Sequence, residues 1–258
     1  MLRLTRSFSI LVLTALLAAC AGPAAAPTAT PMPPTPPDSA AAGDFKLTIV
    51  FDNTTTNPQS VEGWGFAAVV DYDGHRLLFD TGASGSVLLE NMQQLGIDPA
   101  TIEAVILSHQ HGDHVDGLPA LLATGIHPTV YAPALFSESF KRQVKAVTTL
   151  VEVDGAVEIV PGVHTTRPIG SIVEEALVVE TGDGAVVITG CAHPGLVEIV
   201  REAQAVTSSP IAMVIGGFHL GSASESQVSS IIAELRQLGV EKVLPCHCTG
   251  EKLSLIHI

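Results

Sequence analysis

Short apolar runs separated by turn residues dominate the chain from residue 44 onward. Runs of β-branched and aromatic residues predict strands, and apolar residues at helical spacing predict helices. Strands are predicted at 46–51, 66–72, 76–79, 104–107, 129–131, 151–153, 157–160, 176–180, 185–189, 211–215 and 242–245. Helices are predicted at 84–95, 118–123, 195–206 and 225–238.

The order of these elements indicates the architecture. Strands come first and then alternate with helices in both halves, which favours two sheets covered by helices over a single doubly wound sheet. Segment 132–149 is less regular and carries Lys141, Arg142 and Lys145, the densest positive stretch of the chain. It is compatible with a solvated surface helix or with a lid over a site. The loops that follow strands carry nearly all the histidines.

The first 43 residues follow a different pattern. Arg3 and Arg6 precede an apolar run at Ile10–Ala19 that is short for a membrane span and ends in small residues, as secretory signals do. Leu17-Ala18-Ala19-Cys20 resembles the bacterial lipobox, in which the cysteine is lipidated. The alternative is an ordinary signal peptide with an incidental cysteine.

We therefore expect a lipoprotein signal peptide at 1–19 and a Pro/Ala/Thr-rich linker at 20–43 that begins with lipidated Cys20. The linker has almost nothing bulky and apolar to bury, so it should stay extended. One domain is expected at 44–258. The protein would then be exported and anchored to the cell-envelope membrane by its lipid alone.

Composition limits the classes of molecule that the protein is expected to bind. The net charge is −14, and the removal of Arg3 and Arg6 with the signal would make it more negative. An acidic chain without a Lys/Arg cluster is a poor binder of nucleic acid, so we expect a small-molecule substrate. Apart from Cys20, the cysteines are Cys191, Cys246 and Cys248, an odd number that argues against a disulfide framework.

The most informative motif is Ser-His-Gln-His-Gly-Asp-His at residues 108–114. His109 and His111 alternate on an extended loop directly after an apolar run, so both imidazoles can face one side and hold the same ion. Asp113 and His114 then present an oxygen and a nitrogen to a second position. A mixed nitrogen and oxygen set suits zinc, manganese or iron, and the motif therefore predicts a metal site.

This run resembles the signature of the metallo-β-lactamase superfamily, and Leu77–Gly82 resembles a strand-to-loop element of the same superfamily. The resemblance implies an α/β (α+β) fold, an αβ/βα four-layer sandwich with a binuclear site at one sheet edge. It also implies that Asp80 lies behind the metal loop and orients it. The alternative for Asp80 is a turn aspartate before a glycine.

Three later motifs, Thr189–Gly195, Gly216–Leu220 and Pro245–Gly250, resemble one branch of that superfamily. The branch is named for a dihydropterin–ribofuranosyl-aminobenzene phosphate synthase, and many of its members are called metal-dependent hydrolases. The resemblance implies that two further histidines complete the metal shell, giving the set His109, His111, Asp113, His114, His193 and His247. The branch continues past its last motif, so the C-terminal part is expected to be truncated; the tail 253–258 resembles read-through into a sequencing adapter.

Three residues have alternative roles. Cys191 stands where many hydrolases of the superfamily have a bridging aspartate, and it is either a bridging thiolate or a buried, inert cysteine. His164 follows Pro161-Gly162-Val163, which resembles an element that supplies the third ligand of the first metal elsewhere in the superfamily. Val163 is an insertion in that element, so His193 is favoured over His164. His219, at a strand end, would touch substrate, donate a proton, ligate, or only be hydrogen-bonded.

The resemblance implies a metal-dependent hydrolase with two divalent metal ions, zinc foremost and manganese or iron as alternatives. Hydroxide formed at the metals would attack an unidentified small molecule, with Asp113 shuttling a proton to the leaving group and His219 as a second catalytic candidate. The other hypotheses are a transferase like the synthase of the branch, an iron oxidoreductase and a non-catalytic metal-binding lipoprotein. The export signal weighs against the synthase, because the substrates of that pathway are cytosolic.

Overall fold

The computed structural model describes residues 44–250 and contains two six-stranded sheets. The strands are β1 Phe45–Phe51, β2 Ala67–Tyr72, β3 His75–Phe79, β4 Ala104–Ile106, β5 Thr129–Pro133, β6 Leu150–Val153, β7 Glu158–Val160, β8 Val163–Thr165, β9 Leu177–Thr181, β10 Gly184–Thr189, β11 Ile211–Gly217 and β12 Lys242–Cys246. The helices are α1 Gly85–Gln94, α2 Gly112–Val115, α3 Leu118–Ala123, α4 Glu138–Lys145, α5 Leu196–Val206 and α6 Glu225–Gln237, with short 3-10 turns η1 Pro99–Thr101 and η2 His247–Thr249.

The two sheets have the same plan. The first has the order β1-β2-β3-β4-β5-β6, antiparallel from β1 to β3 and parallel from β3 to β6. The second has the order β12-β11-β10-β9-β8-β7, antiparallel from β7 to β10 and parallel from β10 to β12. Parallel strands end at the same edge of a sheet, so the loops after β10, β11 and β12 leave from one edge of the second sheet.

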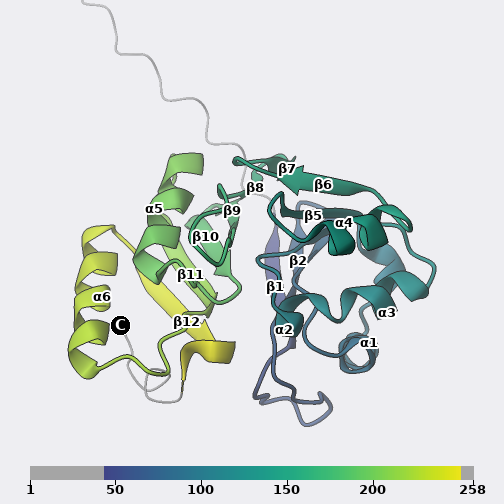
Figure 1. The fold of residues 1–258 in the computed structure, drawn as a ribbon. Coiled ribbons are helices and arrows are strands. Elements are labelled where there is room, and N and C mark those ends of the chain that lie inside the picture. The colour runs from purple at the N-terminus through teal and green to yellow at the C-terminus, as the bar shows by residue number, and fades with distance from the viewer. Residues whose placement is uncertain (1–43, 251–258) are drawn as a thin grey trace, which may run out of the picture. The chain divides into compact units, whose positions relative to one another are not determined.

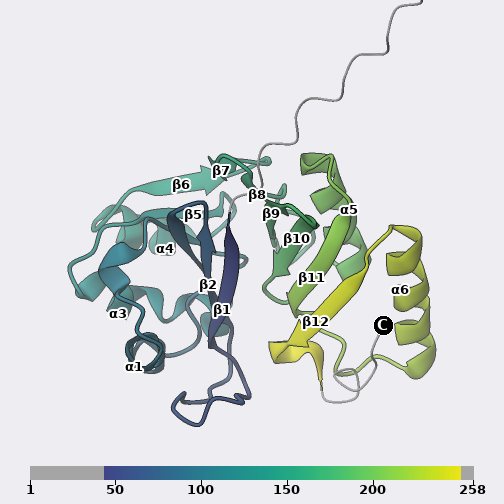
Figure 2. The ribbon, with the colours of Figure 1, turned by 180° about the vertical axis from the view of Figure 1, so that it is seen from behind.

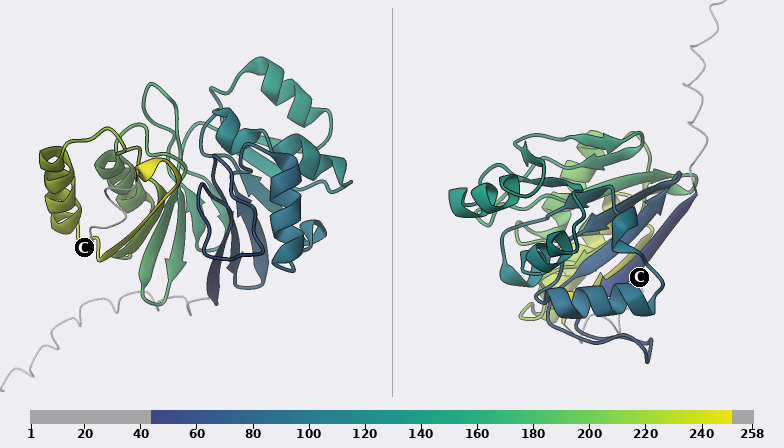
Figure 3. Two further views of the ribbon diagram at one scale, coloured as in Figure 1. Left: turned by 90° about the horizontal axis from the view of Figure 1, so that it is seen from below. Right: turned by 90° about the vertical axis from the view of Figure 1, so that its right-hand side faces the viewer.

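Apolar side chains from the inner faces of both sheets form a common core, which includes Phe79, Ile106, Leu177 and Ile188. The outer face of the first sheet packs against α1, α3 and α4, and the outer face of the second packs against α5 and α6. Figure 1 and the reverse view in Figure 2 show the helices outside and the sheets between them. The view from below in Figure 3 shows the same layering. The predicted four-layer αβ/βα sandwich is thus confirmed.

Local sequence explains several element boundaries. The side chain of Ser84 accepts a hydrogen bond from the Val87 backbone N–H and begins α1. Asp73 and Gly74 both have positive φ, which closes the tight hairpin between β2 and β3. Ser224 and Gln227 form a reciprocal capping box at the start of α6.

The prediction missed β8, a three-residue strand that contains His164. It is too short to show a period-two pattern, and its pairing with β7 and β9 comes from tertiary structure. Segment 132–149 contains α4, which packs Val144 against the first core. Among residues 44–250, no helix is long and apolar enough to cross a membrane. The predicted signal peptide, Cys20, the linker and the tail 251–258 lie outside the described residues.

Candidate metal centre

The ligand-type residues come from loops in both halves of the sandwich. The first half supplies the 108–114 run, which leaves β4 and enters α2 at Gly112. The second half supplies His193 after β10 and His247 after β12. The backbone is strained here: Asp80, Ala192, His219 and His247 all have φ between 47° and 56°. Non-glycine residues hold this left-handed conformation only where surrounding contacts impose it, and such residues concentrate at functional sites.

Three histidine nitrogens converge at a first position. His109 Nε2 lies 3.0 Å from His111 Nδ1, and His193 Nε2 lies 3.2 Å from the same atom. Burial, together with neighbouring His114, lowers the pKa of His109 far below its usual value. Burial and neighbouring His219 lower the pKa of His193 to about 4. The rings of His109 and His193 are therefore suited to act as neutral nitrogen ligands.

A second position is formed by Asp113, His114 and His247. Asp113 Oδ2 lies 3.2 Å from His247 Nε2 and 3.8 Å from His114 Nε2. Burial opposes the charge of Asp113, but His247 and His114 outweigh it and lower the pKa of this carboxyl below its usual range. Cys191 Sγ lies 3.2 Å from His114 Nε2, beside this position.

Hydrogen bonds fix the tautomers of three of these histidines. His114 Nδ1 donates to Asp80 Oδ2 over 2.7 Å, and His247 Nδ1 donates to Asn53 Oδ1 over 3.0 Å. His109 Nδ1 is 2.9 Å from Ser108 Oγ, which itself donates to Asp80. Each ring is thereby left with a lone pair on Nε2, directed into the centre.

A buried atom without a hydrogen bond tests whether these residues fit a metal. His247 Nε2 is buried and makes no hydrogen bond, although Asp113 Oδ2 is close to it. A buried nitrogen lone pair that faces a carboxylate is unfavourable unless a cation lies between them. The donor set of imidazole nitrogens and a carboxylate suits divalent zinc, manganese or iron. The residues present therefore fit divalent metal ions.

Asp80 lies behind the metal loop, as expected from its motif. Its carboxylate is fully buried and accepts hydrogen bonds from the Ser108 backbone N–H, the Ser108 hydroxyl and His114. Each of these bonds is 2.7 Å long. Asp80 therefore orients both the start of the loop and one ring of the second position.

Two supporting groups were missed by sequence reasoning. The buried carboxylate of Glu174 accepts hydrogen bonds of 2.8 Å from the backbone N–H groups of Cys191, Ala192 and His193. The side-chain oxygen of Asn53 accepts hydrogen bonds from His247 Nδ1 and from the Gly65 backbone N–H. These contacts join residues 12 to 194 positions apart, so no local motif signals them.

The other two histidines with candidate roles, His164 and His219, lie outside both sets of three. His164 lies in β8 opposite Glu158 and Val178, and within residues 44–250 it belongs to neither convergent set. His219 is exposed, and its ring centroid lies 4.4 Å from that of His193. It thus lies at the solvent side of the centre, outside both sets of three.

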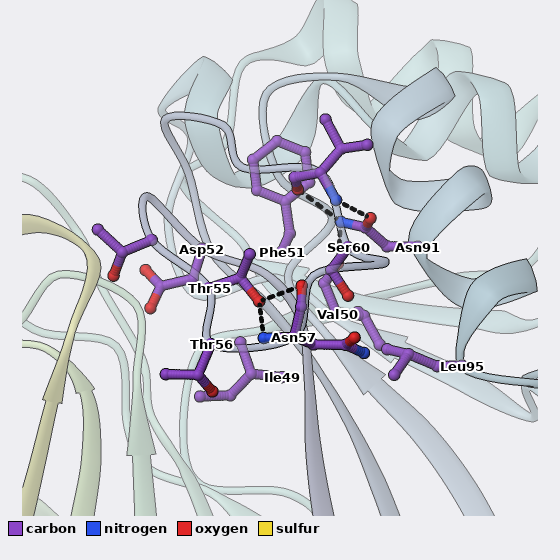
Figure 4. A pocket seen from close by; sticks show the side chains of 12 residues that line it. Ile49, Val50, Phe51, Asp52, Thr55, Thr56, Asn57, Ser60, Asn91 and Leu95 are labelled. Carbon is purple, nitrogen blue, oxygen red and sulfur yellow. Dashed lines mark hydrogen bonds between the residues drawn. The ribbon is translucent and has the colours of Figure 1, made fainter.

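The loop between β1 and β2 borders the second position. Trp64, the only tryptophan of the chain, is 62% exposed and its ring centroid lies 5.2 Å from that of His247. Asn91 of α1 fixes the loop by bonding Val50 O, Val61 O and Val61 N–H. Residues of this loop line a pocket of about 400 Å³. Figure 4 shows the side chains that line it, with Asn91 and Asp52 among them.

Comparison with known proteins agrees with this geometry. A sequence profile described as the metallo-beta-lactamase superfamily matches residues 63–247. The 7,8-dihydropterin-6-methyl-4-(beta-D-ribofuranosyl)-aminobenzene-5'-phosphate synthase of Methanocaldococcus jannaschii is 29% identical over 242 residues, covering 75% of this chain and 82% of its own. This similarity supports homology to the branch of that synthase.

Solved structures give the same picture. A metal-dependent hydrolase of the beta-lactamase superfamily is 29% identical with a TM-score of 0.66, covering 81% of this chain and 90% of its own. The short form of human tRNase Z is 17% identical with a TM-score of 0.54, covering 78% of this chain and 92% of its own, and supports the fold alone. The matched profile covers most of the described residues, including the six convergent ligand-type residues, and the chain belongs to the metallo-beta-lactamase superfamily.

Proposed function

We propose that this protein is a metal-dependent hydrolase that uses two divalent metal ions, zinc foremost, on a small-molecule substrate. The observation that carries the proposal is the convergence of six ligand atoms into two sets of three. His109, His111 and His193 form one set, and Asp113, His114 and His247 form the other. Bound at these positions, divalent metals lower the pKa of water and polarise a substrate oxygen.

The chain itself supplies orientation and proton transfer. Asp80, Ser108 and Asn53 hold the ligand rings in the tautomers that the centre requires. The Asp113 side chain is 18% exposed, so its carboxylate can exchange a proton with a group that enters from solvent. His219 is exposed beside His193 and is placed to donate a proton to a leaving group or to bind the substrate.

A transferase reaction is the second candidate, and the similarity to the Methanocaldococcus jannaschii synthase favours it. The similarity to the metal-dependent hydrolase at the same identity favours hydrolysis. The predicted export signal favours hydrolysis over the transferase reaction, because an exported protein would not meet the cytosolic substrates of the synthase. We accordingly propose an exported lipoprotein that is anchored through Cys20; Cys20→Ser should move it from the membrane fraction to the soluble fraction.

Metal content tests the binuclear site. Elemental analysis of the purified wild-type protein should give at least two metal equivalents, and His111→Ala should retain fewer. His111 is at the first position, where it lies between His109 and His193. A wild-type protein that binds no metal would overturn the proposal.

Turnover tests the reaction class. The wild type should hydrolyse a member of a panel of phosphodiesters, lactones and β-lactams, and Asp113→Ala should reduce its kcat/KM by about 10²-fold or more. His75→Ala is the matched control, because the His75 side chain is 40% exposed and lies 2.8 Å from Glu103 at the surface. Equal losses in both variants would contradict the role of Asp113.

A further inference from the structure

Two cysteine sulfurs meet beside the metal centre. Cys191 follows β10, Cys248 lies in η2, and their Sγ atoms are 3.2 Å apart. A disulfide requires about 2.0 Å between the sulfurs, so the two atoms are in contact and unbonded. Gly217 permits this approach, because a Cβ there would lie 2.8 Å from Cys248 Sγ and 2.3 Å from Gly190 O.

His219 completes a group of three with these sulfurs. The ligand atoms of Cys191, His219 and Cys248 all lie within 4.8 Å of one another. The left-handed backbone of His219, at φ 49°, fixes the direction in which the loop after β11 leaves the sheet. Cys191 is buried, Cys248 is half-buried and His219 is exposed, so one side of the group faces solvent.

This group is distinct from the two sets of three but joined to them. Neither Cys248 nor His219 belongs to the nitrogen and oxygen sets described above. Cys191 provides the link, because its sulfur also groups with His109 and His114 and lies 3.2 Å from His114 Nε2. A metal held by the two sulfurs would therefore share the Cys191 sulfur with the neighbouring position.

We propose that Cys191, Cys248 and His219 form a third, sulfur-containing metal position that takes a zinc-class divalent ion. Two thiolates and an imidazole are ligands that zinc binds tetrahedrally, with Zn–S distances of about 2.3 Å. Three protein ligands leave a fourth position for water or another small ligand, on the solvent side where His219 lies. The proposal concerns metal binding and does not depend on which reaction the protein catalyses.

Cobalt titration tests the proposal. The protein is stripped with a chelator, kept reduced and titrated with Co²⁺, whose bonds to thiolates give near-ultraviolet charge-transfer absorption. The wild type should bind three equivalents with strong thiolate absorption. Cys248→Ser should bind two equivalents and lose most of that absorption. Cys246→Ser is the matched control and should behave as the wild type, because the Cys246 sulfur points to Leu244 O at 3.6 Å.

Two further variants separate the possible outcomes. His219→Ala changes an exposed side chain, so it should fold normally and bind the third equivalent at least tenfold more weakly. His111→Ala should lose an equivalent but keep the thiolate absorption, which distinguishes failure of the nitrogen and oxygen site from failure of the sulfur site. The proposal is overturned if Cys248→Ser keeps the wild-type stoichiometry and spectrum. It is equally overturned if the reduced wild type binds only two equivalents.

Discussion

Glu174 and Glu175 are adjacent, both have no solvent exposure, and they differ completely in their contacts. The Glu174 carboxylate accepts three backbone N–H groups and shapes the loop that carries Cys191 and His193. Both carboxylate oxygens of Glu175 lack a hydrogen-bond partner. Burial, with a smaller contribution from Asp80, raises the pKa of Glu175 well above its usual value.

This contrast predicts opposite effects of the same substitution. Because the pKa of Glu175 is higher in the folded than in the unfolded state, the folded protein binds the extra proton, and stability falls as the pH rises from the unfolded pKa towards the folded one. Glu175→Gln should therefore raise the thermal midpoint at neutral pH by a few degrees and flatten the dependence of that midpoint on pH above the usual pKa of a glutamate. Glu174→Gln should lower the midpoint and weaken metal binding. Parallel pH profiles for wild type and Glu175→Gln would contradict this assignment.

At the scale of elements, the loop after β10 and the metal loop approach each other at a glycine. A Cβ on Gly190 would lie 2.1 Å from Ser108 Oγ and 3.0 Å from Asp80 Oδ2. Gly190 therefore lets a loop of the second sheet pack against the residues that orient the ligands of the first. Gly190 is needed for its lack of a side chain, since no positive φ requires a glycine there.

Gly190→Ala should separate these loops, with a cost of about 1 to 3 kcal/mol in unfolding free energy and weaker metal binding. Denaturant unfolding and metal titration measure the two effects. Gly155→Ala is the matched control, because a Cβ there meets no atom within 4 Å. It should change stability by less than about 0.5 kcal/mol. Equal stability of the two variants would show that the loops can move apart without strain.

The elements also show what local sequence predicts. Strands and helices with several periodic residues, such as α1 and β10, were predicted within one or two residues of their bounds. Helix α2, with four residues, and β8, with three, are too short to show a period. The ligand run at 108–114 was visible because its four ligand-type residues lie within six positions of the sequence. The support from Glu174 and Asn53 was not, because it depends on contacts made only after the sheets pack.

At the scale of the whole described molecule, a shared core ties the two halves together. Leu177 of the second sheet and Leu77 of the first are fully buried in the cluster between the sheets. The first half contributes four of the six candidate ligands and the second half contributes two, so the site depends on this packing. Burial of this apolar surface is the main stabilising contribution between the halves.

Leu177→Ala should lower the unfolding free energy by about 2 to 5 kcal/mol, because it leaves a cavity in a closed core. Denaturant unfolding followed by circular dichroism and by metal release should show both properties lost together. Leu135→Ala is the control, since Leu135 is 78% exposed and should change stability by less than about 0.5 kcal/mol. Metal release well before unfolding of the sheets would contradict the dependence of the site on the shared core.

The bonds between Asn53 and His247 have a consequence for the order of events in the cell. They join residues 194 positions apart, next to the beginning and the end of the sandwich. At about 5 to 20 residues per second, a ribosome takes about 10 to 40 s to travel from one to the other. The nascent chain therefore exposes the 108–114 histidines long before the last ligand emerges. Binding of metal by the complete set must therefore follow the emergence of His247, when the chain first holds every member of its centre.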